Sequence, residues 1–288
     1  MEKDLKIGFI GAGKVGFSLG KFFTERQVHV TGYYSRHKES AQEAAHFTGT
    51  SCYDELSELI TDTDAIFLTV PDGVISQVFG ELMKYDITDK MICHCSGALS
   101  ARDAFPGIES TGATGYSIHP LFPVSSKLNS YREMSDAFFC LEGDAKGIGI
   151  WQILLEYCGV KTKVIGEKDK VKYHCGCAVA SNLVCALIYE SISLLSDCGF
   201  TKEEALEALS PLITSNTEHI VSNGPVRALT GPVERGDIAT IEKHLKCFSD
   251  STELELYRNA SKVLIDAARE KNPMRDYGQL EQVLNAGI

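Results

Sequence analysis

A glycine-rich turn near the start of the chain has the residue types and spacing that bind a diphosphate. The segment Gly11-Ala12-Gly13-Lys14-Val15-Gly16 follows the apolar run Lys6–Ile10 and opens a segment with helical periodicity. In such a turn the first glycine permits a tight bend, the second lets the backbone approach the pyrophosphate, and the third allows close packing of helix and strand. The free N–H groups at the helix start then face the phosphates. Residues 11–16 therefore predict a dinucleotide-binding site.

The end of the second predicted strand, Val28–Tyr34, indicates which dinucleotide binds. A site selective for NAD places an Asp or Glu roughly 20 residues beyond the glycines, where it accepts hydrogen bonds from the ribose hydroxyls. Ser35 and Arg36 stand there instead. A serine hydroxyl and an arginine guanidinium suit a 2′-phosphate, so the sequence predicts NADP(H) rather than NAD(H). An exposed basic loop without a ligand is the alternative.

A third segment, the apolar run Ala65–Val70 followed by Pro71, has the pattern of a buried strand that ends in a sharp turn. Ligands of open parallel sheets bind at the carboxyl ends of the strands. We therefore expect Val70 and Pro71 to flank the bound cofactor. A strand end with a purely structural role is the alternative.

Two histidines are candidates for the proton transfer that accompanies hydride transfer. Reduction of a carbonyl or an imine needs a proton on the developing anion or amine, and a positioned side chain usually supplies it. His119 ends the predicted strand Gly115–His119 and precedes Pro120, so it should lie at the same edge of the sheet. A histidine that caps or packs the strand end is the alternative.

The second histidine, His174, lies near the start of a long predicted helix that runs from about Lys170 to Cys198. Helical periodicity puts Ser181 close to the face of His174, with Asn182 beside it. This stripe of small and polar residues suits a helix that faces a cofactor cleft. We expect His174 to handle protons, and Ser181 and Asn182 to orient the substrate or the carboxamide. An interior, hydrogen-bonded histidine is the alternative.

Composition narrows the partners and the setting. The net charge of −11 disfavours nucleic acid, because no basic run would neutralise its phosphates. No apolar stretch approaches the roughly 20 residues that a membrane span requires, and no signal peptide is expected before the first strand. The ten cysteines lack the spacing of a disulfide framework, and Cys93-His94-Cys95 lacks further metal ligands. We expect a cytoplasmic protein with a small-molecule substrate and no metal.

The order of the predicted elements indicates two domains. Up to Gly166, short apolar runs alternate with amphipathic segments, the pattern of a parallel sheet covered on both faces. Only helices are predicted beyond it, one of them opened by a capping box at Thr201 and Glu204 and interrupted or restarted at Pro211. The sequence thus predicts an α/β fold: a Rossmann-type, mostly parallel sheet with helices on both faces at residues 1–166, then an all-helical substrate and dimerisation domain at residues 167–288.

With these segments in place, the chain resembles the superfamily of 6-phosphogluconate dehydrogenase, pyrroline-5-carboxylate reductase and deazaflavin-dependent NADP reductases. It most resembles a largely uncharacterised family of Rossmann-like NADP-dependent oxidoreductases whose helical half is a domain of unknown function. The resemblance covers nearly the whole chain. It rests on these segments: Gly11–Gly16, Thr69-Val70-Pro71-Asp72, His94-Cys95-Ser96-Gly97, Ser117–Leu121, Tyr173-His174 with Ser181-Asn182, and Leu229–Asp237.

The resemblance implies an NADP(H) cofactor and a homodimer formed through the helical domain. It also implies a cofactor contact at Ser96 and contacts from Thr230 and Arg235 to an acidic group of the substrate. A turn that precedes a helix, with Asp237 as the helix cap, is the alternative. The β-hydroxyacid dehydrogenases of the superfamily carry a catalytic lysine followed four residues later by asparagine. Here Lys170 is followed at that spacing by His174, which argues against β-hydroxyacid chemistry.

The leading prediction is an NADP(H)-dependent oxidoreductase that transfers hydride to or from a small carbonyl or imine substrate in the cleft between the domains. One alternative is hydride transfer between NADP and another soluble coenzyme of the deazaflavin type. The other is an NADP(H)-binding sensor without turnover. A redox-sensing repressor would carry a DNA-binding head, and none is seen before the first strand, which disfavours that form of sensor.

Overall fold

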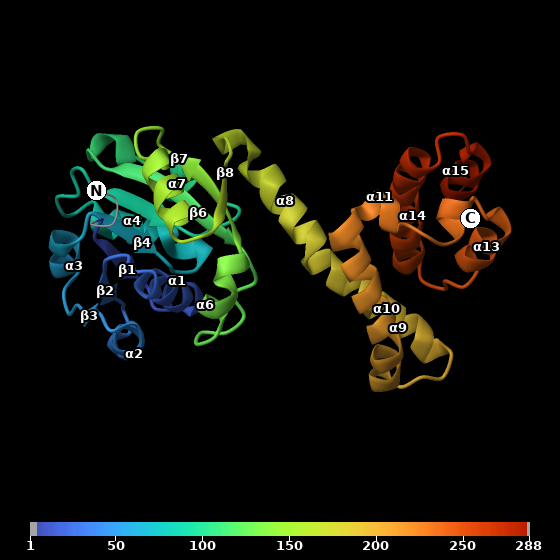
Figure 1. Ribbon diagram of the computed structural model, residues 1–288, viewed down its shortest axis with the longest axis horizontal. Coiled ribbons are helices and arrows are strands. Elements are labelled where there is room, and N and C mark those ends of the chain that lie inside the picture. Colours follow the sequence, from blue (N-terminus) through green and yellow to red (C-terminus); the bar gives the residue numbers. More distant parts are fainter. Residues whose placement is uncertain (1–4, 287–288) are drawn as a thin grey trace. The chain divides into compact units, whose positions relative to one another are not determined.

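The computed structural model describes residues 5–286 of the chain (Figure 1). The residues divide into two compact units, Met1–Ser181 and Asn182–Ile288. The predicted boundary at residue 166 lies after the last strand, whereas this division falls inside the long helical segment. Lys170, near the start of this segment, is 1% exposed and donates a hydrogen bond to Ser117 of the sheet. The start of the segment therefore belongs with the first unit.

Eight strands within residues 5–286 form one sheet, in the order β3-β2-β1-β4-β5-β6-β7-β8. Neighbouring strands are parallel except for the antiparallel pair β6 and β7. The prediction of a Rossmann-type, mostly parallel sheet is therefore confirmed. The strands are β1 (Ile7–Ile10), β2 (Val30–Tyr34), β3 (Ser51–Cys52), β4 (Ala65–Leu68), β5 (Met91–His94), β6 (Thr114–Leu121), β7 (Phe138–Gly143) and β8 (Lys161–Val164).

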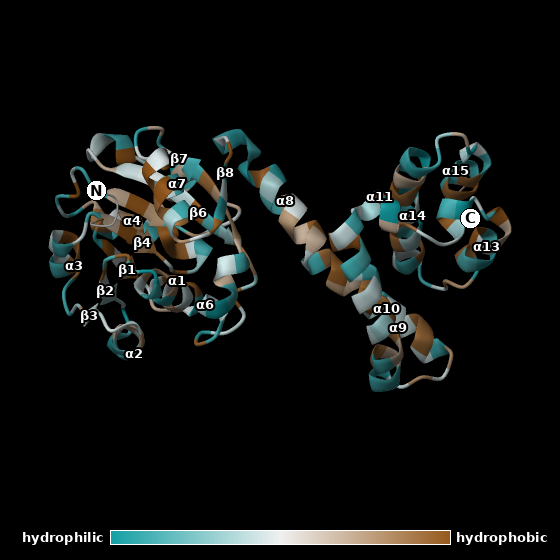
Figure 2. Cartoon of the chain, viewed as in Figure 1, coloured by the Kyte–Doolittle hydropathy of each residue, from teal (hydrophilic) through white to brown (hydrophobic). Residues whose placement is uncertain are grey.

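Helices cover both faces of the sheet, because successive residues of the central strands point to opposite sides. On β4, Phe67 belongs to one buried apolar cluster, with Trp151, and Ile66 belongs to the other, with Phe105. Hydrophobic residues, brown in Figure 2, accordingly recur along the strands. The helices of this unit are α1 (Lys14–Glu25), α2 (Lys38–Thr48), α3 (Leu56–Asp62), α4 (Ile75–Leu82), α5 (Ala101–Ala104), α6 (Ser130–Glu133), α7 (Ile148–Tyr157) and α8 (Lys170–Ala180), with short 3-10 turns η2 (Asp72–Val74), η3 (Ile108–Ser110), η4 (Met134–Asp136) and η5 (Glu167–Asp169).

The second unit consists of helices around a small apolar core that includes Ile241, Ile265 and Leu280. Asp237 caps one helix by accepting a hydrogen bond from the backbone N–H of Thr240 at 3.1 Å, the role that its position before an apolar helix suggests. The helices are α9 (Asn182–Asp197), α10 (Lys202–Asn223), α11 (Pro225–Ala228), α12 (Pro232–Arg235), α13 (Ile238–Leu245), α14 (Ser251–Lys271) and α15 (Gly278–Asn285).

One boundary in this unit was predicted wrongly. Helix α10 begins at the capping box of Thr201 and Glu204, as expected, but continues through Pro211 instead of stopping there. A proline removes one backbone hydrogen bond and crowds the preceding turn, which destabilises the helix locally. The hydrogen bonds of the turns before and after it can still keep the helix continuous.

A helical run over Glu167–Asp197 is long and apolar enough to cross a membrane, as judged by length and composition. The prediction that no stretch approached this length was therefore wrong, because Glu190 is the single charged residue between Cys175 and Leu195. One such helix is weak evidence for a membrane span, since helices of other proteins pass the same test.

Candidate functional site

The glycine turn between β1 and α1 has the geometry of a diphosphate cradle. Gly11 adopts a φ of 102°, a region that favours glycine, and a Cβ on Gly16 would lie 2.5 Å from Oγ1 of Thr69. A Cβ on Gly13, in contrast, would lie no closer than 3.9 Å to its nearest neighbour, the backbone oxygen of Thr69, so the chain leaves this backbone accessible. No side chain caps the start of α1. Open backbone beside an uncapped helix start fits a bound diphosphate.

The other predicted cofactor residues follow the two strands that flank β1. Ile10 of β1 pairs with Tyr34 of β2 and with Leu68 of β4, so the loops after these strands start at one edge of the sheet. Arg36 is exposed in the loop after β2, beside the half-buried Ser35. After β4, Val70 approaches the turn so closely that a Cβ on Gly11 would lie 2.9 Å from its Cγ1. Pro71 follows and is exposed.

Ser96 follows β5 and ties two loops of this edge together. Its hydroxyl donates a hydrogen bond to Oδ2 of Asp72 at 2.6 Å and accepts bonds from the backbone N–H groups of Ala98 and Leu99. Ser96 is 5% exposed, and these three hydrogen bonds hold the loop structure itself.

The two predicted catalytic histidines of the first unit come together at Gly97. A Cβ on Gly97 would lie 2.6 Å from Cδ2 of His174 and 2.9 Å from Nε2 of His119. His119 comes from β6 and His174 from α8, so residues far apart in sequence meet where a glycine leaves room for both. Nδ1 of His119 also lies 2.7 Å from the hydroxyl oxygen of Tyr173, which fixes the orientation of the imidazole.

Behind the histidines lies a buried lysine that the sequence analysis did not assign to the site. Lys170 is 1% exposed, and its ammonium donates a hydrogen bond to Oγ of Ser117 at 2.6 Å. The Ser117 hydroxyl in turn donates to the backbone oxygen of Ser96 at 3.2 Å. Nζ also lies 5.6 Å from the centre of the Tyr173 ring. Burial lowers the pKa of Lys170 from its ordinary value, since it disfavours the charged form.

Strand register gathers the remaining polar groups on one face of the sheet. In the antiparallel pair, Ser117 lies opposite Glu142 and His119 lies opposite Cys140. Residues two apart on a strand share a face, and directly opposite residues are close neighbours. A buried patch of hydroxyl, carboxylate, imidazole and thiol therefore lies where the first turns of α8 pack.

Burial perturbs the acid–base behaviour of this patch. It lowers the pKa of His119 to about 4, with further contributions from the charges of Lys170 and His174. Burial also raises the pKa of the Tyr173 hydroxyl, which is close to the thiols of Cys140 and Cys177. Groups with strongly shifted pKa values in one place are typical of sites that move protons.

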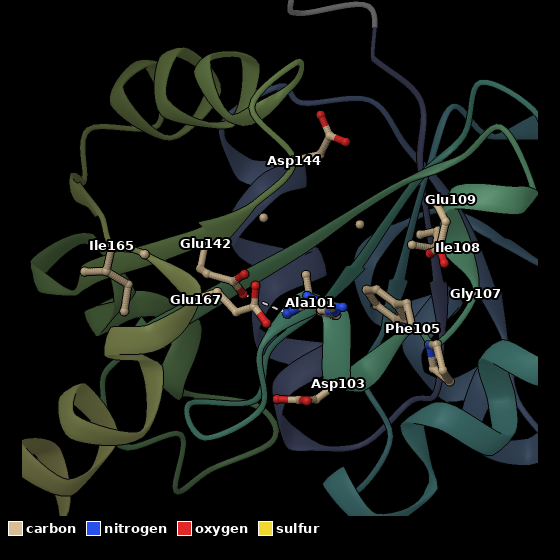
Figure 3. A pocket seen from close by; sticks show the side chains of 15 residues that line it. Ala101, Asp103, Phe105, Gly107, Ile108, Glu109, Glu142, Asp144, Ile165 and Glu167 are labelled. Atoms are coloured by element: carbon tan, nitrogen blue, oxygen red, sulfur yellow. Dashed lines mark hydrogen bonds between the residues drawn. The ribbon is translucent and has the colours of Figure 1, made fainter.

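A cavity of about 770 Å³ adjoins this patch at Glu142. Figure 3 shows Glu142 beside Glu167. Oε2 of Glu142 accepts a hydrogen bond from the backbone N–H of Ala101 at 2.7 Å. The lining is acidic and includes Asp103, Glu109, Glu142, Asp144 and Glu167. None of residues 11–16 lines this cavity, so it is separate from the glycine turn.

The remaining predicted residues lie at the end of the first unit or in the second unit. Ser181 ends the first unit, about two helical turns beyond His174, and its hydroxyl donates to the backbone oxygen of Cys177. Asn182, Thr230 and Arg235 belong to the second unit, where Thr230 and Arg235 are exposed. No group of three or more His, Cys, Asp or Glu side chains within the described residues is arranged to hold a metal ion.

Sequence reasoning missed Lys170, Ser117 and Glu142. The signal for Lys170 was present, because the resemblance placed a lysine at the start of this helix, but the lysine was judged only by the residue four positions later. Glu142 gave no local signal. In the sequence, Glu142 is a single polar residue at the end of an apolar strand, and only the pairing of β7 with β6 brings it next to Ser117.

Two family models match the chain. Residues 6–96 match the family described as NADP oxidoreductase, coenzyme F420-dependent, and residues 137–263 match a domain of unknown function, DUF2520. The prediction of NADP(H) as the cofactor is confirmed at the level of the first family. No curated protein is similar enough in sequence to count as a match.

Solved structures similar to the chain include protein TM1727 from Thermotoga maritima, at 29% identity and a TM-score of 0.72, covering 92% of this chain and 99% of that one. Protein BF3122 from Bacteroides fragilis is 17% identical, with a TM-score of 0.69 and coverage of 92% and 100%. A reductive aminase from Aspergillus terreus, in complex with NADPH and ethyl levulinate, is 14% identical, with a TM-score of 0.66 and coverage of 98% and 100%. The last two show the fold alone. The chain is therefore similar to the NADP oxidoreductase, coenzyme F420-dependent, family over residues 6–96 and to the DUF2520 domain over residues 137–263.

Proposed function

We propose that this chain binds NADP(H) at its glycine turn and transfers hydride between the nicotinamide and a small carbonyl or imine compound. The observation that carries the proposal is the pairing of two features in one unit. An open glycine turn before an uncapped helix lies at the sheet edge, and a buried patch of proton-handling groups lies on strands of the same sheet. Bound NADPH would supply the hydride, and the chain must then manage the accompanying proton.

The phosphate selectivity would come from the loop after β2. Arg36 is exposed there, and Ser35 precedes it. A guanidinium offers several N–H donors to a phosphate, whereas the ribose hydroxyls of NAD need an acceptor that this loop lacks. The match of residues 6–96 to an NADP oxidoreductase family supports the same choice.

The shifted pKa values suit His119 and Lys170 to different steps of proton transfer. His119, with a pKa of about 4, is neutral near pH 7 and suits the acceptance of a proton when a substrate is oxidised. In the reductive direction the ammonium of Lys170 is the better source, because burial moves its pKa down toward the working range. His119 and His174 would contact the substrate beside Gly97. Lys170, which is hydrogen-bonded to Ser117, would supply the proton and a positive charge to the site.

The roles implied by resemblance remain proposals. Ser181 and Asn182 would orient the substrate or the carboxamide, and Thr230 and Arg235 would bind an acidic group of the substrate. The reductive aminase from Aspergillus terreus has a similar fold and was solved with NADPH and a keto ester, which supports a carbonyl or imine as the substrate class.

A second candidate is hydride transfer between NADP and another soluble coenzyme. The description of the family matched at residues 6–96 names coenzyme F420, and this is the observation that favours it. A deazaflavin would accept or donate hydride at the same nicotinamide face, so the cofactor site would be unchanged. The two candidates differ in what must be added for NADPH to be consumed.

We also propose that the chain forms a homodimer through its helical unit. Helix α9 has no buried residue, and Ala205 is the buried residue of α10. Large apolar side chains are exposed along both helices, among them Leu187 and Leu212. Contiguous exposed apolar surface usually marks an interface. A second copy of the chain would supply the same surface in a symmetric pair.

Replacement of Arg36 by alanine should weaken NADPH binding roughly 10- to 100-fold, because one charge-assisted phosphate contact is lost. Binding of NADH should change little. Isothermal titration calorimetry with both cofactors measures this. Lys161→Ala, which removes an exposed cation on β8, the terminal strand on the side of the sheet away from β2, is the matched control and should leave both affinities unchanged. Equal losses for NADPH and NADH would contradict a 2′-phosphate contact.

Replacement of Lys170 by methionine should lower kcat by about 10²- to 10⁴-fold while NADPH affinity is kept, since the proton source is removed but the glycine turn is not. NADPH oxidation against a panel of small ketones, 2-oxo acids and cyclic imines is the assay. Lys172→Met removes an exposed neighbour and should behave as the wild type. NADPH consumption that appears only after a deazaflavin is added would favour the second candidate.

The imidazole of His119 should stay neutral until the pH falls to about 4, against an ordinary value of 6.5, because burial disfavours its charged form. Nitrogen-15 NMR of labelled histidine measures the midpoint, and His119→Asn identifies the signal. Between pH 6.5 and about 4 the unfolded chain binds this proton and the folded chain does not, so the free energy of unfolding should fall as the pH is lowered through this window. This fall should be smaller in His119→Asn. A midpoint near 6.5 would show that the ring is solvated.

Light scattering coupled to gel filtration should give about twice the 31.5 kDa mass of the chain. The double replacement Leu187→Glu and Leu212→Glu should shift the mass toward the monomer, because charges would enter the apolar contact. Met83→Glu changes an exposed apolar residue just after α4 and should leave the mass unaltered. A wild-type chain that runs as a monomer at all concentrations would refute the dimer.

A further inference from the structure

Lys170 is held in a setting that works against its charge. The side chain is 1% exposed, and its ammonium donates to the hydroxyl of Ser117 rather than to a carboxylate. A buried ammonium without a nearby negative group tends to lose its proton. If Lys170 is to hold a proton near pH 7, a group close to it must favour the charged form.

The strand register identifies such a group. Ser117 on β6 lies directly opposite Glu142 on β7, so the acceptor of the Lys170 hydrogen bond and the Glu142 carboxylate are cross-strand neighbours on one face of the sheet. Glu142 is itself only 4% exposed. A carboxylate and an ammonium that share a buried, low-dielectric region interact strongly even without direct contact.

Titratable groups face Lys170 from β5, β6, β7 and α8, and Glu142 is the carboxylate among them. Burial raises the pKa of the neighbouring thiols of Cys95 and Cys140, which keeps them neutral. The facing titratable groups are His94 on β5, Cys95 after β5, His119 on β6, Cys140 and Glu142 on β7, and Tyr173 and Cys177 on α8, with the charge of His174 acting on His119.

Glu142 also connects this buried region to the cavity of about 770 Å³. Its Oε2 accepts the backbone N–H of Ala101, and the side chain forms part of the cavity lining (Figure 3). Lys170 itself is not among the lining residues. The Glu142 side chain therefore borders a space large enough for water and is also the cross-strand neighbour of Ser117, to which Lys170 donates.

We propose that Glu142 is a positioning residue that keeps the Lys170 side chain protonated and so makes it available as the proton source of the site. An effect of Glu142 on turnover rests on the proposed function. The electrostatic interaction between Glu142 and Lys170, which we call the charge link, does not depend on it. Glu142 acts through Lys170 and need not touch the substrate. The first turn of α8 holds the ammonium of this pair, and β7, paired with β6, holds its carboxylate.

The test measures the titration of Lys170 directly in the full-length protein. Lysine labelled with carbon-13 at Cε reports the charge of each amine by NMR, and Lys170→Met identifies the Lys170 signal. Glu142→Gln removes the charge but keeps an oxygen that accepts the Ala101 N–H. The midpoint of Lys170 should fall by about one pH unit, because an opposite charge nearby favours the ammonium. Glu142→Asp should restore most of the shift.

Asp144→Asn is the matched control, because it removes another acidic group of the same cavity lining that is not among the groups acting on Lys170. It should leave the Lys170 midpoint in place. An unchanged midpoint in Glu142→Gln, or an equal fall in Asp144→Asn, would overturn the proposal. If Glu142→Gln fails to fold, the reciprocal measurement decides. Lys170→Met should raise the midpoint of Glu142, followed with carbon-13 glutamate, and no rise would refute the link.

The outcome can be separated from that of the proposed function. Calorimetry with NADPH on Glu142→Gln should give the wild-type affinity, since Glu142 lies away from the glycine turn. Where turnover is measurable, the basic limb of the kcat profile should move to lower pH by the same amount as the NMR midpoint. A shifted midpoint in a protein that turns over no substrate would support the charge link while refuting the function.

Discussion

The buried ammonium of Lys170 is the interaction on which the arrangement of this site depends. Moving an ammonium out of water costs several kcal/mol unless its hydrogen bonds and charge are compensated. The bond to Ser117 and the nearby carboxylate of Glu142 provide that compensation on the face of the sheet. The first turn of α8 is therefore anchored to β6, and helical geometry then carries Tyr173 and His174 to the positions where they meet His119 and Gly97.

This anchoring places two kinds of chemistry on neighbouring strands of one sheet. The features that we propose to bind phosphate follow β1 and its neighbours β2 and β4, and the groups that we propose to handle protons follow β5 or lie on β6 and β7. Because parallel strands end at a common edge, the loops after β4 and β5 link the two regions through the bond from Ser96 to Asp72. A change in either loop should therefore be felt on both sides of the site.

The successes and failures of sequence reasoning follow from the range of the interactions involved. The glycine turn, the strand alternation and the helix caps at Thr201 and Asp237 are set by residues a few positions apart, and the structure bears out those elements. Pro211 was misjudged because the stability of a helix is shared over its whole length, so one unfavourable residue need not end it. The apolar run after Cys175 was overlooked because its small residues and thiols do not stand out as hydrophobic individually.

The sequence by itself determined the Rossmann-type sheet, the helical second part and the NADP cofactor class, because periodicity, turn glycines and the missing acid after β2 are local properties. Only the tertiary structure decided that Lys170, Ser117, Glu142 and the two histidines share one place. Strand order and cross-strand register are set by packing over the whole sheet, and no local pattern states which residue of β7 will face which residue of β6. The charge of a side chain in such a site depends on those distant neighbours, so its chemistry is a property of the fold.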